Sequence, residues 1–178
     1  MKEKEFNLTF KKHDGTVIKD VHEYVKYWIS ENPHGTITIG CDSQEHAKFV
    51  KYAVSVVMHH RTYLGRDKIT GEKEYAGHGA HVISAVFVDT SKTMKSDIFT
   101  KLWAETDITL AVAKKIGDIG VKPVLHLDYN SDESEYSHVL YNAGIGFAKG
   151  MGYEAFGKPF AWAASHTADR VAKSGRKR

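Results

Sequence analysis

The sequence predicts an α/β fold, from two features of its order. Three segments rich in β-branched residues, at 36–41, 51–59 and 81–89, follow one another before any long helical pattern occurs. A helical pattern over 97–116 then leads into a strand pattern at 122–128, the arrangement typical of a crossover to a parallel neighbour. Helix and strand patterns alternate from there to the end of the chain.

The N-terminal part predicts a short strand and one helix. The sequence FNLTF at 6–10 is typical of a strand, and His-Asp-Gly at 13–15 of a turn. Residues 21–29 carry apolar side chains at helical spacing, namely Val21, Val25 and either Trp28 or Ile29. We therefore expect a helix that ends in the turn-forming segment 32–35.

The segment between the second and third strands is long. Residues 60–80 contain Gly65, Gly71, Gly77 and Gly79, and they exceed the usual length of a hairpin connection. We expect a connection that is functional or mobile.

The second half predicts three helices and two strands. Ser96 or Asp97 is placed to cap the helix that runs to Ile116, with Gly117 or Gly120 as its end. A strand at 122–128, a helix over 137–149, a short strand near 153–156 and a final helix from about Ser165 follow. The chain thus predicts three strands, then helix, strand, helix, strand and helix.

Composition indicates one domain and excludes several classes of protein. The chain has 178 residues, 42% of them hydrophobic, which suits a single core. No apolar run is long enough to span a membrane, and the charged start is unlike a secretory signal, so we expect a cytoplasmic protein that has no contact with membrane. Cys41 is alone, which excludes an intramolecular disulfide and a Cys-x-x-Cys motif.

The net charge of +3 comes from the C-terminal end. Residues 170–178 hold five of the cations and no acid, so residues 1–169 carry −2. A basic balance is often an electrostatic signal for nucleic acid, but here it belongs to a tail on a slightly acidic body.

Two aspartates come at the ends of predicted strands. Side chains alternate across a strand, so Asp42 shares a face with Thr38 and Gly40, and Asp128 shares one with His126. If the two strands are parallel neighbours, both carboxylates lie at the C-terminal edge of the sheet, where open α/β sheets bind ligands. Turn capping by each aspartate is the alternative.

Two further acids lie on predicted helices. Glu105 is in the middle of the 97–116 helix, with Asp107 as a rival if the register is misjudged. Asp169 lies three residues after His166, on one face of the last helix. Two like charges about 5 Å apart repel by about 3 kcal/mol at an effective dielectric near 20, so convergence would require cations or protons. Oxygen-only ligands favour Mg²⁺ or Mn²⁺.

Three segments carry a family resemblance. They are TITIGCDSQ at 36–44, VLHLDYN at 124–130 and KPFAWAASHTADRVAK at 158–173. Together with the order of the elements they resemble the ribonuclease H-like superfamily, and more closely its YkuK-like branch of bacterial and phage proteins. The last segment is also similar to the closing helix of RuvC-type resolvases.

The resemblance covers about residues 34–175 and implies a ribonuclease H-like fold. It implies a five-stranded mixed sheet, its first three strands antiparallel, flanked by helices. Residues 1–33 are then an N-terminal strand and helix packed on the core, and residues 176–178 the end of a basic tail. It also implies two metal ions, Mg²⁺ or Mn²⁺, held by four acids: Asp42, Glu105, Asp128 and Asp169. Asp42 would bridge the ions.

Several other residues keep two interpretations. Ser43 is expected either to contact a phosphate or to cap a turn. The acidic run 131–135 is expected to be a solvated loop. His166, beside Asp169, is a candidate for proton transfer or phosphate binding, and His126 a weaker one. The histidines at 78 and 81 lack the further ligands of a zinc site.

The sequence therefore predicts a metal-dependent nuclease that hydrolyses phosphodiester bonds in nucleic acid. The catalytic set would be Asp42, Glu105, Asp128, Asp169 and His166. Two alternatives remain, namely a non-catalytic module that binds nucleic acid through its basic tail and a hydrolase of small phosphoesters. The oligomeric state and the choice among RNA, DNA and hybrid are left open by the sequence.

Overall fold

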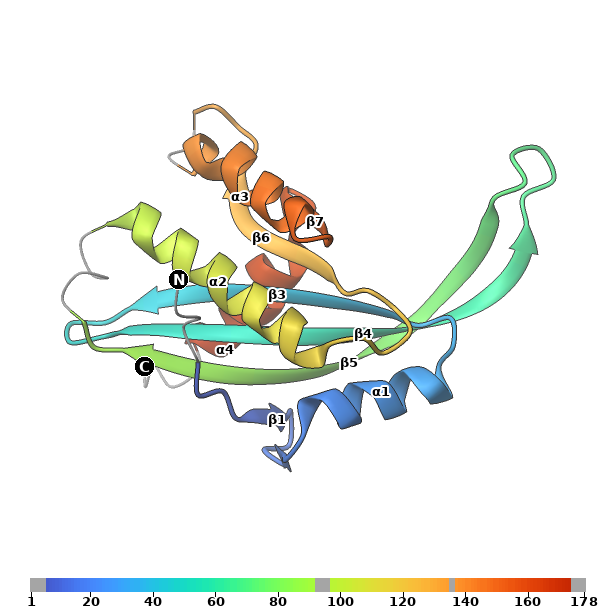
Figure 1. The fold of residues 1–178 in the computed structure, drawn as a ribbon, viewed down its shortest axis with the longest axis horizontal. Coiled ribbons are helices and arrows are strands. Elements are labelled where there is room, and N and C mark those ends of the chain that lie inside the picture. The colour runs from blue at the N-terminus through green and yellow to red at the C-terminus, as the bar shows by residue number, and fades with distance from the viewer. Residues whose placement is uncertain (1–5, 92–96, 135–136, 174–178) are drawn as a thin grey trace.

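A computed structural model describes residues 6–91, 97–134 and 137–173 of the chain. Within these residues the fold is one seven-stranded sheet flanked by helices (Figure 1). The strand order across the sheet is β2-β1-β5-β4-β3-β6-β7. The strands are β1 (Phe10–Lys12), β2 (Val17–Ile18), β3 (Thr36–Glu45), β4 (Val50–Arg66), β5 (Lys73–Asp89), β6 (Val124–Asn130) and β7 (Glu154–Lys158).

The sheet is mixed, as expected. The strands β3, β4 and β5 are antiparallel neighbours, and β6 and β7 add to the β3 side in parallel. The α/β class is therefore confirmed. The expected number of five strands is wrong, because β1 and β2 extend the sheet beyond β5 to seven.

The two additional strands form a very short hairpin at the edge. Gly15 has a φ of 88° in its turn, a conformation that suits glycine. Phe10 pairs with Ile18, and both side chains are buried. The strand expected at 6–10 begins only at Phe10, because this pair, rather than the apolar residues before it, anchors the edge.

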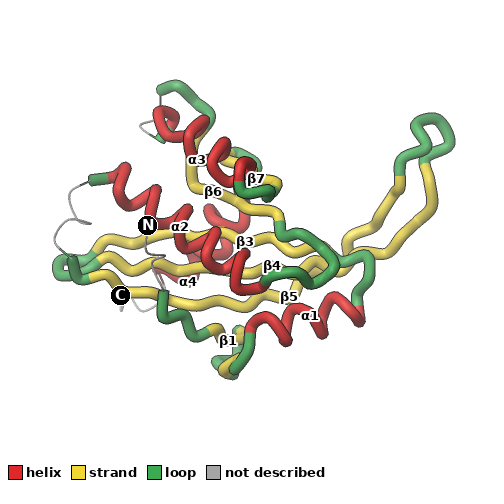
Figure 2. The backbone as a smooth tube through the Cα atoms, in the orientation of Figure 1, coloured by secondary structure: helices red, strands yellow, loops and turns green. Residues whose placement is uncertain are grey.

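The 60–80 segment is not a loop. It forms the outer halves of β4 and β5, a two-stranded ribbon that extends well beyond the rest of the molecule (Figures 1 and 2). Tyr63 and Tyr75 are cross-strand partners in it, and the Arg61 guanidinium lies 4.1 Å from the centre of the Tyr75 ring. Gly65 has a φ of 133° beside a shift of register. Of the four glycines in the segment, Gly71 lies in the turn that joins the strands, whereas Gly65, Gly77 and Gly79 lie within the strands themselves.

Helices cover both faces of the sheet. The helices α1 (Val21–Glu31), α2 (Ile98–Ile116) and α3 (His138–Gly150) lie on one face, where α2 packs against β3 and β6, and α3 packs against β6 and β7. On the other face, a π-helical turn η2 (Ala163–Ala168) continues into α4 (Asp169–Lys173) and packs against β3 and β4. In the described residues, no helix is both long and apolar enough to cross a membrane.

The expected boundaries of α1, α2 and α3 agree closely with the structure, whereas the last helix, expected from about Ser165, begins as the π-helical turn at Ala163. Asp97 caps α2 by accepting a hydrogen bond from the Phe99 N–H at 3.0 Å, and Gly117 ends the helix with a φ of 67°. Ser96, the other candidate cap, lies outside the described residues, as does the tail at 174–178. Both ends of α2 are thus defined by capping residues.

Candidate metal centre

The site lies where β3 and β6 separate. These strands pair only from Thr38 with Val124 to Gly40 with His126, although β3 stays paired with β4 along its whole length. Beyond Gly40 the two strands diverge, and Asp42 and Asp128 come two residues after the last pair on each strand. The divergence leaves room between two neighbouring strands for polar side chains.

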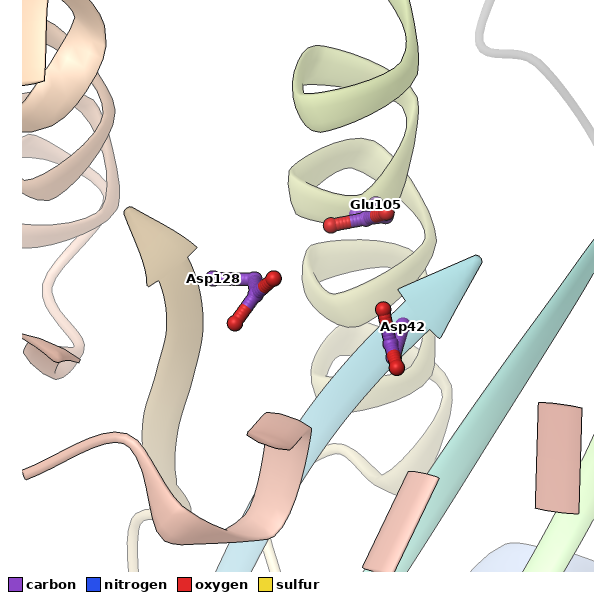
Figure 3. A group of neighbouring side chains, drawn as sticks. All are labelled: Asp42, Glu105 and Asp128. Atoms are coloured by element: carbon purple, nitrogen blue, oxygen red, sulfur yellow. The ribbon is translucent and has the colours of Figure 1, made fainter. Parts of the chain in front are cut away.

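Three carboxylates meet in this space. One oxygen each of Asp42, Glu105 and Asp128 lies within 4.8 Å of the other two. In Figure 3, Asp42 comes from β3, Asp128 from β6, and Glu105 from α2, which crosses behind the gap between the strand ends. The structure thus brings together three of the four acids that the sequence analysis selected as metal ligands.

The register of α2 explains why Glu105 belongs to the group. It lies on the buried stripe of the helix with Leu102 and Thr109, and its side chain is 5% exposed. The Thr109 hydroxyl donates to the Glu105 carbonyl oxygen at 2.8 Å, which holds the helix backbone at this point. Asp107, the alternative candidate on this helix, is not in the group.

The surroundings of Glu105 disfavour its charged form. Ser43 Oγ donates to Glu105 Oε1 at 2.6 Å, which is the contact that Ser43 makes in place of a turn cap. Glu105 Oε2 is buried and has no hydrogen-bond partner among the described residues. Burial, followed by the charge of Asp128, raises the pKa of Glu105 well above its usual range.

Asp42 and Asp169 form the second part of the site. Asp169, at the start of α4, is close enough to Asp42 to influence its titration. Burial, the charge of Asp128 and the contact with Asp169 raise the pKa of Asp42 to about 7, although the Ser43 N–H opposes this by donating to Asp42 Oδ1 at 2.8 Å. The fourth acid is therefore beside Asp42 but outside the three-carboxylate group.

Two lysines that are not among the predicted site residues form ion pairs with the carboxylates. Lys158 Nζ lies 2.8 Å from Asp128 Oδ1, and Lys173 Nζ lies 2.6 Å from Asp169 Oδ1. Lys173 follows Asp169 by four residues on a helix, a spacing that could have indicated the pair. No spacing in the sequence indicates the contact of Lys158 with Asp128, because this contact depends on the pairing of β7 with β6.

The two histidines considered for catalysis lie in different surroundings. His126 is buried, and its Nδ1 accepts a hydrogen bond from the Ala163 N–H at 3.1 Å. Burial and then the charge of His59 lower the pKa of His126 to about 4, so it is neutral at physiological pH and packs η2 onto the sheet. His166 lies on η2, is exposed and is not in the carboxylate group.

The donor set fits a divalent cation. All three converging ligands are carboxylates, as hard cations such as Mg²⁺ and Mn²⁺ prefer. The partnerless Glu105 Oε2 is an acceptor that such an ion would satisfy. Burial and the charge of Asp128 raise the pKa values of Asp42 and Glu105, and a bound cation would offset both effects.

The fold and the site place the chain in a known family. The family model described as Ribonuclease H-like matches residues 16–173, and the chain therefore belongs to the ribonuclease H-like family. The narrower YkuK-like resemblance is consistent with that family. Comparison with curated proteins and with solved structures finds no significant match.

Proposed function

We propose that the protein is a metal-dependent nuclease that hydrolyses phosphodiester bonds in nucleic acid. The observation that supports it best is the convergence of Asp42, Glu105 and Asp128 at the point where β3 and β6 separate. Membership of the ribonuclease H-like family supports the choice of reaction, and the matched residues 16–173 include all three carboxylates.

In this proposal each acid has a distinct place. Asp42, Glu105 and Asp128 would hold Mg²⁺ or Mn²⁺, and Asp169, beside Asp42, would help to hold a second ion. Bound divalent ions would activate a water molecule and stabilise the leaving oxygen of the phosphodiester. Glu105 is buried and would lie at the bottom of the site. Asp42 and Asp128 are half-buried and would be accessible to a substrate. His166 remains a proposal for proton transfer.

A phosphate group can approach this site only if bound cations reverse the negative charge of the carboxylates. Without a metal ion, the carboxylates would repel a phosphodiester. Each bound divalent ion adds two positive charges, and Lys158 and Lys173 already stand at the rim. The proposed partner is therefore nucleic acid bound in the presence of divalent cations.

The test is cleavage of a substrate panel. The protein is incubated with RNA–DNA hybrid, single-stranded RNA, single-stranded DNA and four-way junctions, with Mg²⁺ or Mn²⁺ and then with EDTA. We expect cleavage that requires metal, is lost in Asp42→Asn and Asp128→Asn, and persists in Asp107→Asn as the matched control. Absence of cleavage of every substrate, or cleavage undiminished in the first two variants, would overturn the proposal.

The same panel separates the alternatives. Turnover of nucleotides or model phosphoesters without polymer cleavage would identify a small-substrate hydrolase. Binding without turnover, abolished by removal of residues 170–178, would identify a binding module.

A further inference from the structure

Lys158 forms an ion pair with one member of the three-carboxylate group. Its Nζ lies 2.8 Å from Asp128 Oδ1. The Lys158 side chain is 38% exposed, whereas that of Asp128 is 16% exposed. The Lys158 ammonium group thus contacts a carboxylate of the site, and the Lys158 side chain is also accessible from solvent.

The backbone of Lys158 is fixed independently of this ion pair. Its strand pairs with β6 at Asn130, and Ser131 Oγ donates to the Lys158 carbonyl oxygen at 3.1 Å. At the preceding Gly157, a Cβ atom would lie 2.4 Å from the Tyr141 ring and 2.7 Å from the Tyr129 carbonyl oxygen. Only glycine permits this close approach of β7, which brings Lys158 to Asp128.

The charges around the site show what Lys158 contributes. Lys158 forms an ion pair with Asp128, and one oxygen each of Asp42 and Glu105 lies within 4.8 Å of an oxygen of that same carboxylate. An ammonium group has three donors, more than its ion pair with one carboxylate oxygen requires.

We infer that Lys158 is a resident cation of this site, which positions Asp128, competes with the divalent cation for the charge of that carboxylate, and offers its remaining donors to a substrate phosphate. The inference rests on the proposed function for its substrate, but not for its effect on metal binding. It predicts two effects of opposite sign, since loss of the lysine charge strengthens metal binding and weakens binding of the phosphate. A merely structural role would weaken both.

The first test is titration of the metal-free protein with Mn²⁺ by calorimetry. We expect Lys158→Met to bind Mn²⁺ about tenfold more tightly than the wild type, a screened estimate for one charge at a half-exposed position. Lys158→Arg, which keeps the charge, and Lys149→Met, which removes an exposed lysine on α3, are expected to match the wild type. If Lys158→Met does not give a native circular dichroism spectrum, Lys158→Gln replaces it.

The result is decisive in either direction. Equal or weaker Mn²⁺ binding by the neutral variants, or no Mn²⁺ binding by the wild type, would overturn the inference.

The second test is kinetic: the KM of Lys158→Met for the nucleic acid is expected to rise about tenfold, while the KM of Lys149→Met stays unchanged. An unchanged KM would overturn the phosphate contact. If the wild type cleaves no substrate, the proposed nuclease function fails, and the Mn²⁺ titration alone still decides whether Lys158 is the counter-charge.

Discussion

Replacement of Asp42 by Asn is expected to stabilise the metal-free protein at pH 8. Burial, Asp128 and Asp169 together raise the pKa of Asp42 from 3.8 to about 7, so at pH 8 the folded protein holds an unfavourable charge. Asparagine removes that charge and keeps the local contacts. Its Oδ1 can still accept from the Ser43 N–H, and its amide can donate to Asp169 as a protonated Asp42 would.

The magnitude follows from the difference between the folded and unfolded states. Because the folded pKa is above the unfolded one, the stability that Asp42 contributes is fully present below about pH 4 and is lost as the pH rises through 7. At about 1.4 kcal/mol per pH unit, the loss amounts to at most about 4 kcal/mol. Solvent screening at a half-buried carboxyl reduces this, and we expect about 2 kcal/mol at pH 8.

The assay is urea denaturation in EDTA at pH 5 and pH 8. The free energy of unfolding of Asp42→Asn should exceed that of the wild type by about 2 kcal/mol at pH 8, and by less at pH 5. Saturating Mn²⁺ should then stabilise the wild type more than the variant. An advantage that is the same at both pH values, or a variant less stable than the wild type at pH 8, would refute the electrostatic reasoning.

Three further predictions concern the supporting residues. Glu105→Gln should abolish the rise in melting temperature caused by Mn²⁺, whereas Asp107→Asn should retain it; a retained rise in the first variant would contradict the choice of ligand. Gly144→Ala should lower the free energy of unfolding by about 1–3 kcal/mol or abolish folding, because the new Cβ would lie 2.0 Å from the Tyr129 ring; urea denaturation that matches the wild type would refute the close packing. Ser43→Ala should cost about 1 kcal/mol of stability at pH 5 in EDTA, since it removes the donor to Glu105 Oε1, and no loss in the same denaturation assay would show that the hydrogen bond is dispensable.

The central strands could be predicted because burial leaves a plain pattern. Ile37, Ile39 and Cys41 alternate with polar or small residues, and all three are buried in the structure. The edge hairpin and the ribbon at 60–80 could not be predicted in the same way. Their strands are short or largely exposed, so cross-strand pairing such as that of Tyr63 with Tyr75 stabilises them without an apolar pattern.

The candidate site divides along similar lines. The alternation of side chains along β3 and β6 predicts Asp42 and Asp128 at one edge, as the structure has them. Glu105 came from the family resemblance, with Asp107 as a rival, and the structure shows Glu105 on the buried side of α2. The close approach of Lys158 depends on the pairing of β7 and on the space that Gly157 leaves, which are tertiary properties. A lysine at a strand end is otherwise typical of a solvated position.

The most direct test of the central claim is the position of Mn²⁺ in crystals of the protein grown with the ion. Anomalous scattering from manganese would locate it without reference to activity. The account predicts an anomalous peak between the carboxylates of Asp42, Glu105 and Asp128, and its loss in Asp128→Asn crystals. Manganese found elsewhere, with none at these three carboxylates, would contradict the account.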